Sequence, residues 1–230
     1  MAAFRFKRFA VEQDGVAMKV GTDGVLLGAW ADCSTAKRVL DIGTGTGVIA
    51  LMIAQRSDAE RVVGIDIDAA AAECAAANFA ASPWSDTLEA VQISAQEFTG
   101  EKFDLILSNP PYFVDSLLCP DSQRTTARHT TELTFEQLDK AVCRLMSSNG
   151  KFALILPTEQ MERYIALTSL NLVRRCDVHP VEGGAVKRVM AEFAFELQDV
   201  VTESIAIERG RRGDYTEQYV TLTKDFYLKF

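Results

Sequence analysis

The chain alternates between short apolar runs and longer segments in which apolar residues recur with helical spacing. Short β-branched runs between turn signals are typical of buried strands, and apolar residues every three or four positions are typical of helices. This pattern predicts strands over residues 38–42, 61–65, 88–93, 103–107, 152–156, 173–178 and 189–195, and helices over residues 48–56, 68–80, 133–146 and 159–170. Asn149 and Gly150 are expected to end the third helix. The alternation predicts an α/β fold with a doubly wound, mostly parallel sheet whose last two strands are antiparallel.

Residues 1–37 precede the first predicted strand and belong to the same single predicted domain, residues 1–230. Apolar residues alternate after Phe4, and Asp14-Gly15 is a turn signal, so we expect a short hairpin here. Thr22 and Asp23 are expected to cap a short helix that runs through Trp30. This N-terminal segment is therefore predicted to pack as a clip over the core formed by residues 38–230.

Three glycines follow the first predicted strand directly. Gly43, Gly45 and Gly47 allow positive φ angles and let a ligand approach the backbone closely. The helix that begins near Gly47 points free N–H groups at the same place, which suits a carboxylate or another anion. A dinucleotide fingerprint would need glycine or alanine where Val48 stands, so a ligand without a pyrophosphate is favoured over NAD. Asp41 lies just before the glycines, where its carboxylate could hold a cationic amino group.

An acidic residue ends the second predicted strand. Asp66 lies about 20 residues beyond the glycine loop, where a carboxylate can accept hydrogen bonds from both hydroxyls of a ribose. The alternative is that the glycines only form a tight turn and that Asp66 caps the next helix. For Asp68, helix capping is the favoured role.

The sequence Asn109-Pro110-Pro111-Tyr112 follows the fourth predicted strand. Ligands of a doubly wound sheet bind beyond the carboxyl ends of the strands, so Asn109 and the glycine loop should meet at one crevice. The Asn109 side-chain oxygen and the Pro110 carbonyl can each accept one hydrogen of a planar NH2 group, and the two prolines hold these acceptors in place. Tyr112 offers an aromatic face on which a base can stack, and Phe113 can extend it. The alternative is a proline-rich turn with a buried tyrosine.

Composition narrows the class of protein. The chain has 230 residues, 48% of them hydrophobic, and no apolar run approaches the roughly 20 residues that span a bilayer. No apolar signal core follows the basic start, so a cytoplasmic protein is expected. Five dispersed cysteines without a Cys-x-x-Cys spacing, together with two distant histidines, argue against a disulfide framework or a metal site. The net charge of −8 would repel nucleic acid, so any RNA site must be a local basic patch.

At these motifs the chain resembles the class I S-adenosylmethionine-dependent methyltransferases that act on amino groups. The resemblance runs nearly end to end and includes MKVGTDGVLLGAW at 18–30, SNPPYF at 108–113, ARHTT at 127–131 and YTEQY at 215–219. Within that class these segments are similar to the bacterial family that methylates the N6 amine of the adenine next to the anticodon of valine tRNA. The resemblance implies a seven-stranded sheet with a reversed last strand, S-adenosylmethionine as cofactor and tRNA as substrate.

The resemblance also implies roles for individual residues. The cofactor would be held by glycines and polar residues of the predicted loops, namely Asp41, Gly43, Gly45, Gly47 and Asp66, and its methionine end would be closed over by Lys19, Thr22 and Asp23. The target adenine would be held by the acceptor motif and its neighbours, namely Asn109, Pro110, Pro111, Tyr112 and Phe113. Relatives often carry aspartate near positions 95–96 to bind the adenine amine of the cofactor. Gln96 stands here, and its amide oxygen can still accept that hydrogen bond.

Four short basic segments could form the local patch for RNA: residues 5–8, Arg124 with Arg128, Lys187 with Arg188, and residues 209–212. Each alone is more often a solvated surface, and the hypothesis is that at least two of them flank the crevice. Arg211 and Arg212 can make bidentate phosphate contacts, and His129 could stack on a flanking base or cap a surface element. The expected partner is a tRNA, with no membrane and no metal, and the protein is expected to act as a monomer.

Two alternatives to a tRNA enzyme remain. The same acceptor motif suits the amide of a protein glutamine or an adenine in DNA, although relatives with those substrates usually carry an additional helical or recognition domain. Residues 1–37 favour a small clip instead. The second alternative is a non-catalytic RNA-binding module that kept the fold, in which loss of Asn109 or of a loop glycine would be expected.

Overall fold

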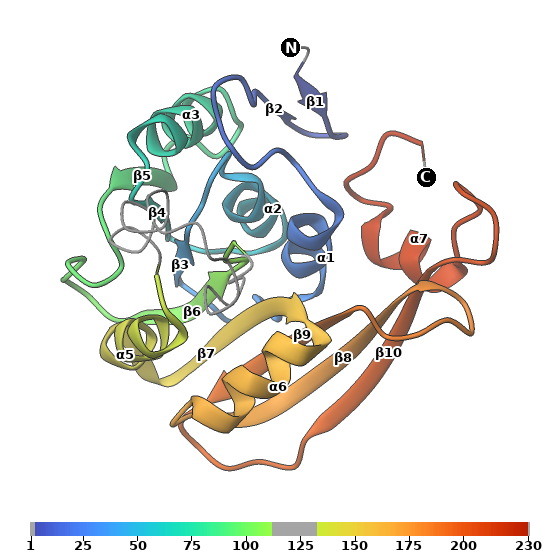
Figure 1. Cartoon of the computed structure of the whole chain (residues 1–230). Helices are drawn as coiled ribbons and strands as arrows, with labels where there is room; N and C mark the ends of the chain where they lie inside the picture. The colour runs from blue at the N-terminus through green and yellow to red at the C-terminus, as the bar shows by residue number, and fades with distance from the viewer. Residues whose placement is uncertain (1–2, 112–132, 230) are drawn as a thin grey trace, which may run out of the picture.

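The computed structural model describes residues 3–111 and 133–229, so residues 1–2, 112–132 and 230 lie outside the described chain. Within the described residues, eight strands form one sheet (Figure 1). From one edge to the other they are β10 (Val201–Glu208), β8 (Asn171–Val181), β9 (Arg188–Ala194), β7 (Met146–Pro157), β6 (Phe103–Ser108), β3 (Arg38–Ile42), β4 (Arg61–Asp66) and β5 (Leu88–Gln92). Neighbours are parallel except that β9 is antiparallel to both β7 and β8. The expected α/β fold with a mostly parallel sheet is confirmed.

The seven predicted strands are all present, and β9 is the reversed strand. The eighth strand, β10, was not predicted; it pairs parallel with β8 and forms an edge of the sheet. Val201, Thr202 and Ser204 of this strand are exposed, and only Ile205 is fully buried. An edge strand has a neighbour on one side only, so its sequence can be mostly polar and carries a weak strand signal.

Helices cover both faces of the sheet (Figure 1). One face is covered by α1 (Thr22–Trp30), α2 (Val48–Arg56) and α3 (Ala69–Ala80), and the other by α5 (Phe135–Leu145) and α6 (Thr158–Leu167). A last helix, α7 (Glu217–Thr223), packs against β10 and α1. Successive strand residues point to opposite faces, so Val39 packs in the core under α1 and α2 while Leu40 packs in the core under α5 and α6. Burial on both faces explains why the central strands are continuous apolar runs.

The N-terminal segment differs most from its prediction. Strands β1 (Phe4–Arg5) and β2 (Ala10–Val11) pair antiparallel, but the turn lies between them, where the Phe6 N–H donates to the Phe9 carbonyl at 2.9 Å. The turn expected at Asp14-Gly15 therefore follows the hairpin instead of closing it. The reason is aromatic packing, because the Phe6 ring stacks on Phe9 and on Tyr227 near the other end of the chain.

Two predicted helix ends also require correction. Gly21 is the N-cap residue of α1 and provides no side-chain cap, so Thr22 and Asp23 are the first residues of the helix and not its caps. Helix α5 ends at Leu145 and β7 starts immediately, so Asn149 and Gly150 lie within a strand. The register between β6 and β7 shifts there, and a Cβ at Gly150 would lie 2.9 Å from the carbonyl oxygen of Phe103. Glycine is therefore needed for the close approach of two strands and does not stop a helix.

In the part of the chain that the structure describes, no helix is both long and apolar enough to cross a membrane. The same residues contain no group of three or more His, Cys, Asp or Glu side chains that could hold a metal ion. Four cysteines fall within the described ranges, and all four are free thiols: Cys33, Cys74, Cys143 and Cys176.

Candidate active site

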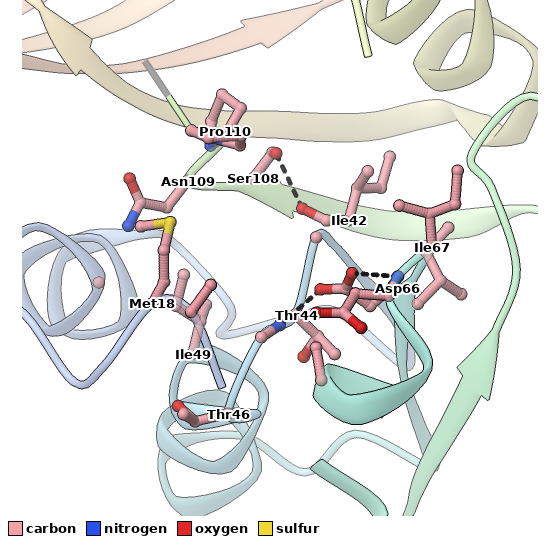
Figure 2. A pocket seen from close by; sticks show the side chains of 18 of the residues that line it. Met18, Ile42, Thr44, Thr46, Ile49, Asp66, Ile67, Ser108, Asn109 and Pro110 are labelled. Atoms are coloured by element: carbon pink, nitrogen blue, oxygen red, sulfur yellow. Dashed lines mark hydrogen bonds between the residues drawn. The ribbon is translucent and has the colours of Figure 1, made fainter. Parts of the chain in front are cut away.

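A cavity of about 590 Å³ opens beyond the carboxyl ends of β3, β4 and β6, beside the start of α1 (Figure 2). Its walls come from residues within five segments, 16–24, 42–49, 65–71, 93–96 and 108–111, and from Leu133. This volume lies within the range of small-molecule sites. Parallel strands direct their carboxyl ends to one edge of the sheet, so the structure brings the glycine loop and the Asn-Pro-Pro motif together as expected.

The glycine loop supplies the floor of the cavity. Gly43, Gly45 and Gly47 have φ angles of 73°, 57° and 80°, which side chains rarely adopt. Gly43 and Gly45 line the cavity. Gly47 does not line it; it is the N-cap of α2, and a Cβ there would lie 2.4 Å from the Phe79 ring. Gly47 therefore serves the packing of the loop against α3, whereas the other two glycines expose backbone to a ligand.

Asp66 lies in the cavity wall, and both of its carboxylate oxygens hold backbone. Its Oδ2 accepts the Gly45 N–H at 2.9 Å and its Oδ1 accepts the Asp68 N–H at 3.0 Å (Figure 2). Each oxygen keeps a second lone pair for a ligand hydroxyl. Asp68 accepts the Ala70 N–H at 3.0 Å as the N-cap of α3, so its predicted capping role is confirmed.

Asp41 lies behind the glycine loop and not in the cavity wall. Its side chain is fully buried, and Oδ2 accepts the Thr44 hydroxyl at 2.7 Å. Burial raises the pKa of Asp41 to about 7, the Thr44 hydrogen bond opposes that rise, and the nearby charge of Asp66 adds to it. The other oxygen, Oδ1, has no hydrogen-bond partner of normal geometry among the described residues. Its partner Thr44 lines the cavity, and Asp41 does not.

The acceptor motif is tied to the glycine loop by a serine. Ser108, Asn109, Pro110 and Pro111 all line the cavity. Ser108 is fully buried, and its Oγ donates to the Ile42 carbonyl at 2.9 Å, so the end of β6 is fastened to the end of β3 (Figure 2). The motif and the loop are therefore joined directly at the sheet edge. Five candidate substrate residues lie outside the described chain: Tyr112, Phe113, Arg124, Arg128 and His129.

The opposite wall comes from the N-terminal segment. Lys19, Thr22 and Asp23 all line the cavity, as does Gln96 on the other side. Asp23 Oδ2 accepts the Arg188 Nε–H at 2.8 Å, so one arginine of a predicted RNA patch pairs with the cavity wall. In Figure 2, Met18 and Asn109 lie at one end of the cavity, and Asp66 and Ile67 lie at the other.

Several apolar residues of the cavity were missed in the sequence: Val16, Met18, Ile67, Ile93 and Leu133. Met18 and Ile67 remain 45% and 51% exposed, so both present apolar surface to the cavity. A signal existed for Ile67 and Ile93, because each directly follows a strand whose end faces the site. For Met18 no local signal existed, since its position depends on how residues 12–20 cross the sheet edge.

The predicted basic loop, residues 209–212, leaves the same edge of the sheet as Asn109. Strand β10 runs parallel to β8, and β8 runs in the direction of β7 and β6, so the carboxyl ends of all four strands point the same way. Four inter-strand spacings separate β10 from β6, or about 19 Å. Arg211 and Arg212 are exposed there.

In the N-terminal patch, Lys7 Nζ donates to the Lys224 carbonyl and the Arg8 guanidinium lies 5.1 Å from the centre of the Trp84 ring.

A mostly parallel sheet whose strand ends bring a glycine loop and an Asn-Pro-Pro motif to one cavity is typical of the class I methyltransferases. Comparison with known families agrees with this class. Residues 20–162 match the methyltransferase small domain family, and the chain belongs to that family. A Phocaeicola vulgatus protein named tRNA1(Val) (adenine(37)-N6)-methyltransferase is 48% identical, and the match covers 98% of this chain and 97% of that protein. A protein of the same name from Actinobacillus succinogenes is 42% identical over 99% of this chain and 98% of its own length.

Solved structures share the fold at low sequence identity. A predicted O-methyltransferase from Agrobacterium tumefaciens is 18% identical with a TM-score of 0.67, covering 89% of this chain and 96% of that one. A 16S rRNA N2 guanosine methyltransferase from T. thermophilus, solved with AdoMet and guanosine, is 19% identical with a TM-score of 0.59 and covers 85% of this chain and 50% of that one. These similarities confirm the class I methyltransferase fold expected from the sequence.

Proposed function

We propose that the protein transfers the methyl group of S-adenosylmethionine to the exocyclic N6 amine of an adenine in tRNA, next to the anticodon of a valine tRNA. One observation carries the proposal: a single cavity is lined both by the glycine loop and by Asn109 and Pro110. Relatives named for this reaction match the chain over nearly its whole length, which supports the same substrate.

The cavity residues fit S-adenosylmethionine. Free lone pairs of Asp66 suit the ribose hydroxyls, Ile67 and Ile93 suit the faces of the adenine, and Gln96 can accept from its amine. The start of α2 and the cradle at Gly43 and Gly45 suit the amino-acid end, and the proposal adds Lys19, Thr22 and Asp23 as its cover. When bound, the cofactor supplies a methyl group on a positively charged sulfur.

The acceptor side makes a poor nucleophile react. The lone pair of an adenine amine is delocalised into the ring, so the nitrogen attacks weakly. The Asn109 side-chain oxygen and the Pro110 carbonyl accept its two hydrogens, which draws the nitrogen toward tetrahedral geometry and aims its lone pair. Pro111, Tyr112 and Phe113 are proposed to contact the base. In-line placement supplies most of the acceleration, and a strong general base is not required.

The tRNA is proposed to extend from the cavity along the carboxyl edge of the sheet toward Arg211 and Arg212, with Arg128 and His129 near the flanking bases. A spacing of about 19 Å equals several nucleotides, so a stem could contact the basic loop while one base enters the cavity. The proposal includes action as a monomer in the cytoplasm.

The RNA part of the proposal predicts salt-dependent binding that involves the 209–212 loop. In an Arg211→Ala/Arg212→Ala variant we expect tRNA affinity to fall about tenfold in low salt, and the slope of log affinity against log salt to decrease by about two, because two phosphate contacts are lost. Filter binding across a salt series measures both quantities. Unchanged affinity and slope would remove this loop from the RNA site.

The direct test uses tRNA from cells that lack the gene, incubated with the protein and methyl-labelled S-adenosylmethionine, then digested to nucleosides. Label in N6-methyladenosine is expected, and tRNA from wild-type cells should take up little label because the position is already modified. The Asn109→Ala protein, incubated in the same way, gives the background level of label. Absence of label in RNA, despite cofactor binding, would favour a protein glutamine or DNA substrate, or a non-catalytic RNA-binding module.

A further inference from the structure

A buried asparagine joins two segments that lie far apart in the sequence. Asn78 on α3 is 2% exposed, and both ends of its side-chain amide are used. Its Oδ1 accepts the Glu12 N–H at 2.8 Å, and its Nδ2 donates to the carbonyls of Glu12 and Thr46, each at 2.9 Å. One side chain therefore connects the N-terminal segment to the glycine loop.

Both connected segments lead into the cavity. Thr46 belongs to the glycine loop and lines the cavity. Glu12 begins the strap, by which we mean residues 12–20, and Val16 to Lys19 of the strap form part of the opposite wall. A second bond closes the strap on itself, because the Gln13 side-chain oxygen accepts the Val20 N–H at 3.1 Å. Asn78 lies outside the cavity wall, so its effect on a ligand must pass through these two segments.

The strap buries little apolar surface of its own. Ala17, Met18 and Lys19 are exposed, and Val16 is its only buried apolar residue. A segment with few apolar contacts loses order readily unless its backbone is held by hydrogen bonds. The bond from Asn78 to Thr46 is buried and its two bonds with Glu12 are partly buried, and a hydrogen bond shielded from water is costly to leave unmade. The start of the strap is thus fastened to the glycine loop that forms the floor of the site.

We propose that Asn78 is a positioning residue for the cofactor: it fastens the strap to the glycine loop, so that the strap closes over the amino-acid end of S-adenosylmethionine. The inference rests on the proposed function, since it requires that the cavity take this cofactor. Asp66 and Ile67 lie at the end of the cavity away from Met18, so the adenosine half is held independently of the strap (Figure 2). Asn78 should therefore affect only ligands that carry the amino-acid end.

Two ligands separate a positioning role from a merely structural one. S-adenosylhomocysteine carries the amino-acid end, and 5′-methylthioadenosine lacks it. In titration calorimetry we expect Asn78→Ala to weaken S-adenosylhomocysteine binding by about tenfold, the loss expected for one to two buried hydrogen bonds. Binding of 5′-methylthioadenosine should stay within about twofold of wild type. A general loosening of the fold or of the loop would weaken both ligands equally and would overturn the inference.

Two further variants keep the test decisive even if Asn78→Ala folds poorly. Gln13→Ala removes the bond that closes the strap without touching the core, and it should weaken S-adenosylhomocysteine several-fold and 5′-methylthioadenosine not at all. The matched control is Asn171→Ala, whose amide donates to the Phe195 carbonyl at 2.9 Å at the opposite edge of the sheet and should change neither affinity. Unchanged S-adenosylhomocysteine binding in Gln13→Ala would contradict the role of the strap.

The outcomes also separate this inference from the proposed function. A wild-type protein that binds neither ligand would overturn the proposed function and the inference with it. A wild-type protein that binds both, with variants that do not distinguish them, would overturn the inference alone.

Discussion

The two walls of the cavity are built in different ways. The inner wall, made of the glycine loop, Asp66 and the Asn109 motif, lies at the ends of neighbouring strands and is held by strand pairing and by bonds between adjacent strand ends, such as that between Gly45 and Asp66. The outer wall is the strap and the start of α1, which reach the same cavity through long-range contacts from Asn78 and Arg188. Where the ends of neighbouring strands build a site, a sequence motif after each strand marks it. Where side chains from other parts of the fold hold the site together, no sequence motif marks them.

The sharpest way to test this comparison is to separate two roles within the inner wall. We expect Asn109→Ala to lower kcat by about 100-fold or more, since it removes an acceptor that acts on the reacting amine, while cofactor affinity stays nearly unchanged. Asp66→Ala should instead weaken cofactor binding with less effect on kcat. Steady-state kinetics and calorimetry on both variants measure this, and the reverse pattern would show that the two roles are wrongly assigned.

A large stability effect is expected at Gly47, where the glycine loop of the inner wall packs against α3. Alanine there combines a positive φ of 80° with a Cβ 2.4 Å from the Phe79 ring, so Gly47→Ala should lower the free energy of unfolding by about 3 kcal/mol. Gly183 has a similar φ of 73° but nothing within 4 Å of a Cβ, and Gly183→Ala should cost about 1 kcal/mol. Chemical denaturation measures both, and equal losses would mean that the contact with α3 does not hold the loop.

The buried carboxyl of Asp41 gives the inner wall a pH dependence. Burial raises its pKa from 3.8 to about 7, so between those values the folded state holds a proton that the unfolded state has released. The free energy of unfolding therefore falls as the pH rises through this window. Asp41→Asn still accepts from Thr44 and cannot ionise, so its melting temperature relative to wild type should rise by roughly 5 °C from pH 5 to pH 8. A constant difference across this range would contradict a neutral Asp41.

The smallest expected effect concerns the ion pair between Arg188 and Asp23, the second long-range contact of the outer wall. Arg188→Ala removes the ion pair between Arg188 and Asp23. Both side chains are partly exposed, and such ion pairs are weak, so S-adenosylhomocysteine binding should fall only about threefold. Arg209→Ala breaks a more exposed pair with Asp214 and serves as the control with unchanged binding. If Arg188→Ala weakened S-adenosylhomocysteine binding more than Asn78→Ala does, the ion pair and not Asn78 would be the main contact that holds the outer wall.

The same contrast explains which predictions from the sequence are confirmed. Strand β3 and helix α2, with the glycine loop between them, have the predicted bounds. The hairpin turn was misplaced because aromatic packing between Phe6 and Tyr227 outweighs the local turn signal at Asp14-Gly15. The edge strand β10 was missed because it pairs on one side only and polar residues 202–204 interrupt the apolar alternation between Val201 and Ile205.

By itself the sequence determined the class of fold, the positions of seven strands along the chain and the meeting of the glycine loop with the Asn109 motif, because strand periodicity, positive-φ glycines and the parallel sheet rule are local or topological constraints. Only the tertiary structure decided that Asp41 lies behind the loop, that Gly47 packs on Phe79, and that Asn78 fastens the strap. The contacts of Gly47 with Phe79 and of Asn78 with Thr46 and Glu12 join residues tens of positions apart, and the burial of Asp41 depends on everything packed around it, so no local sequence pattern marks them.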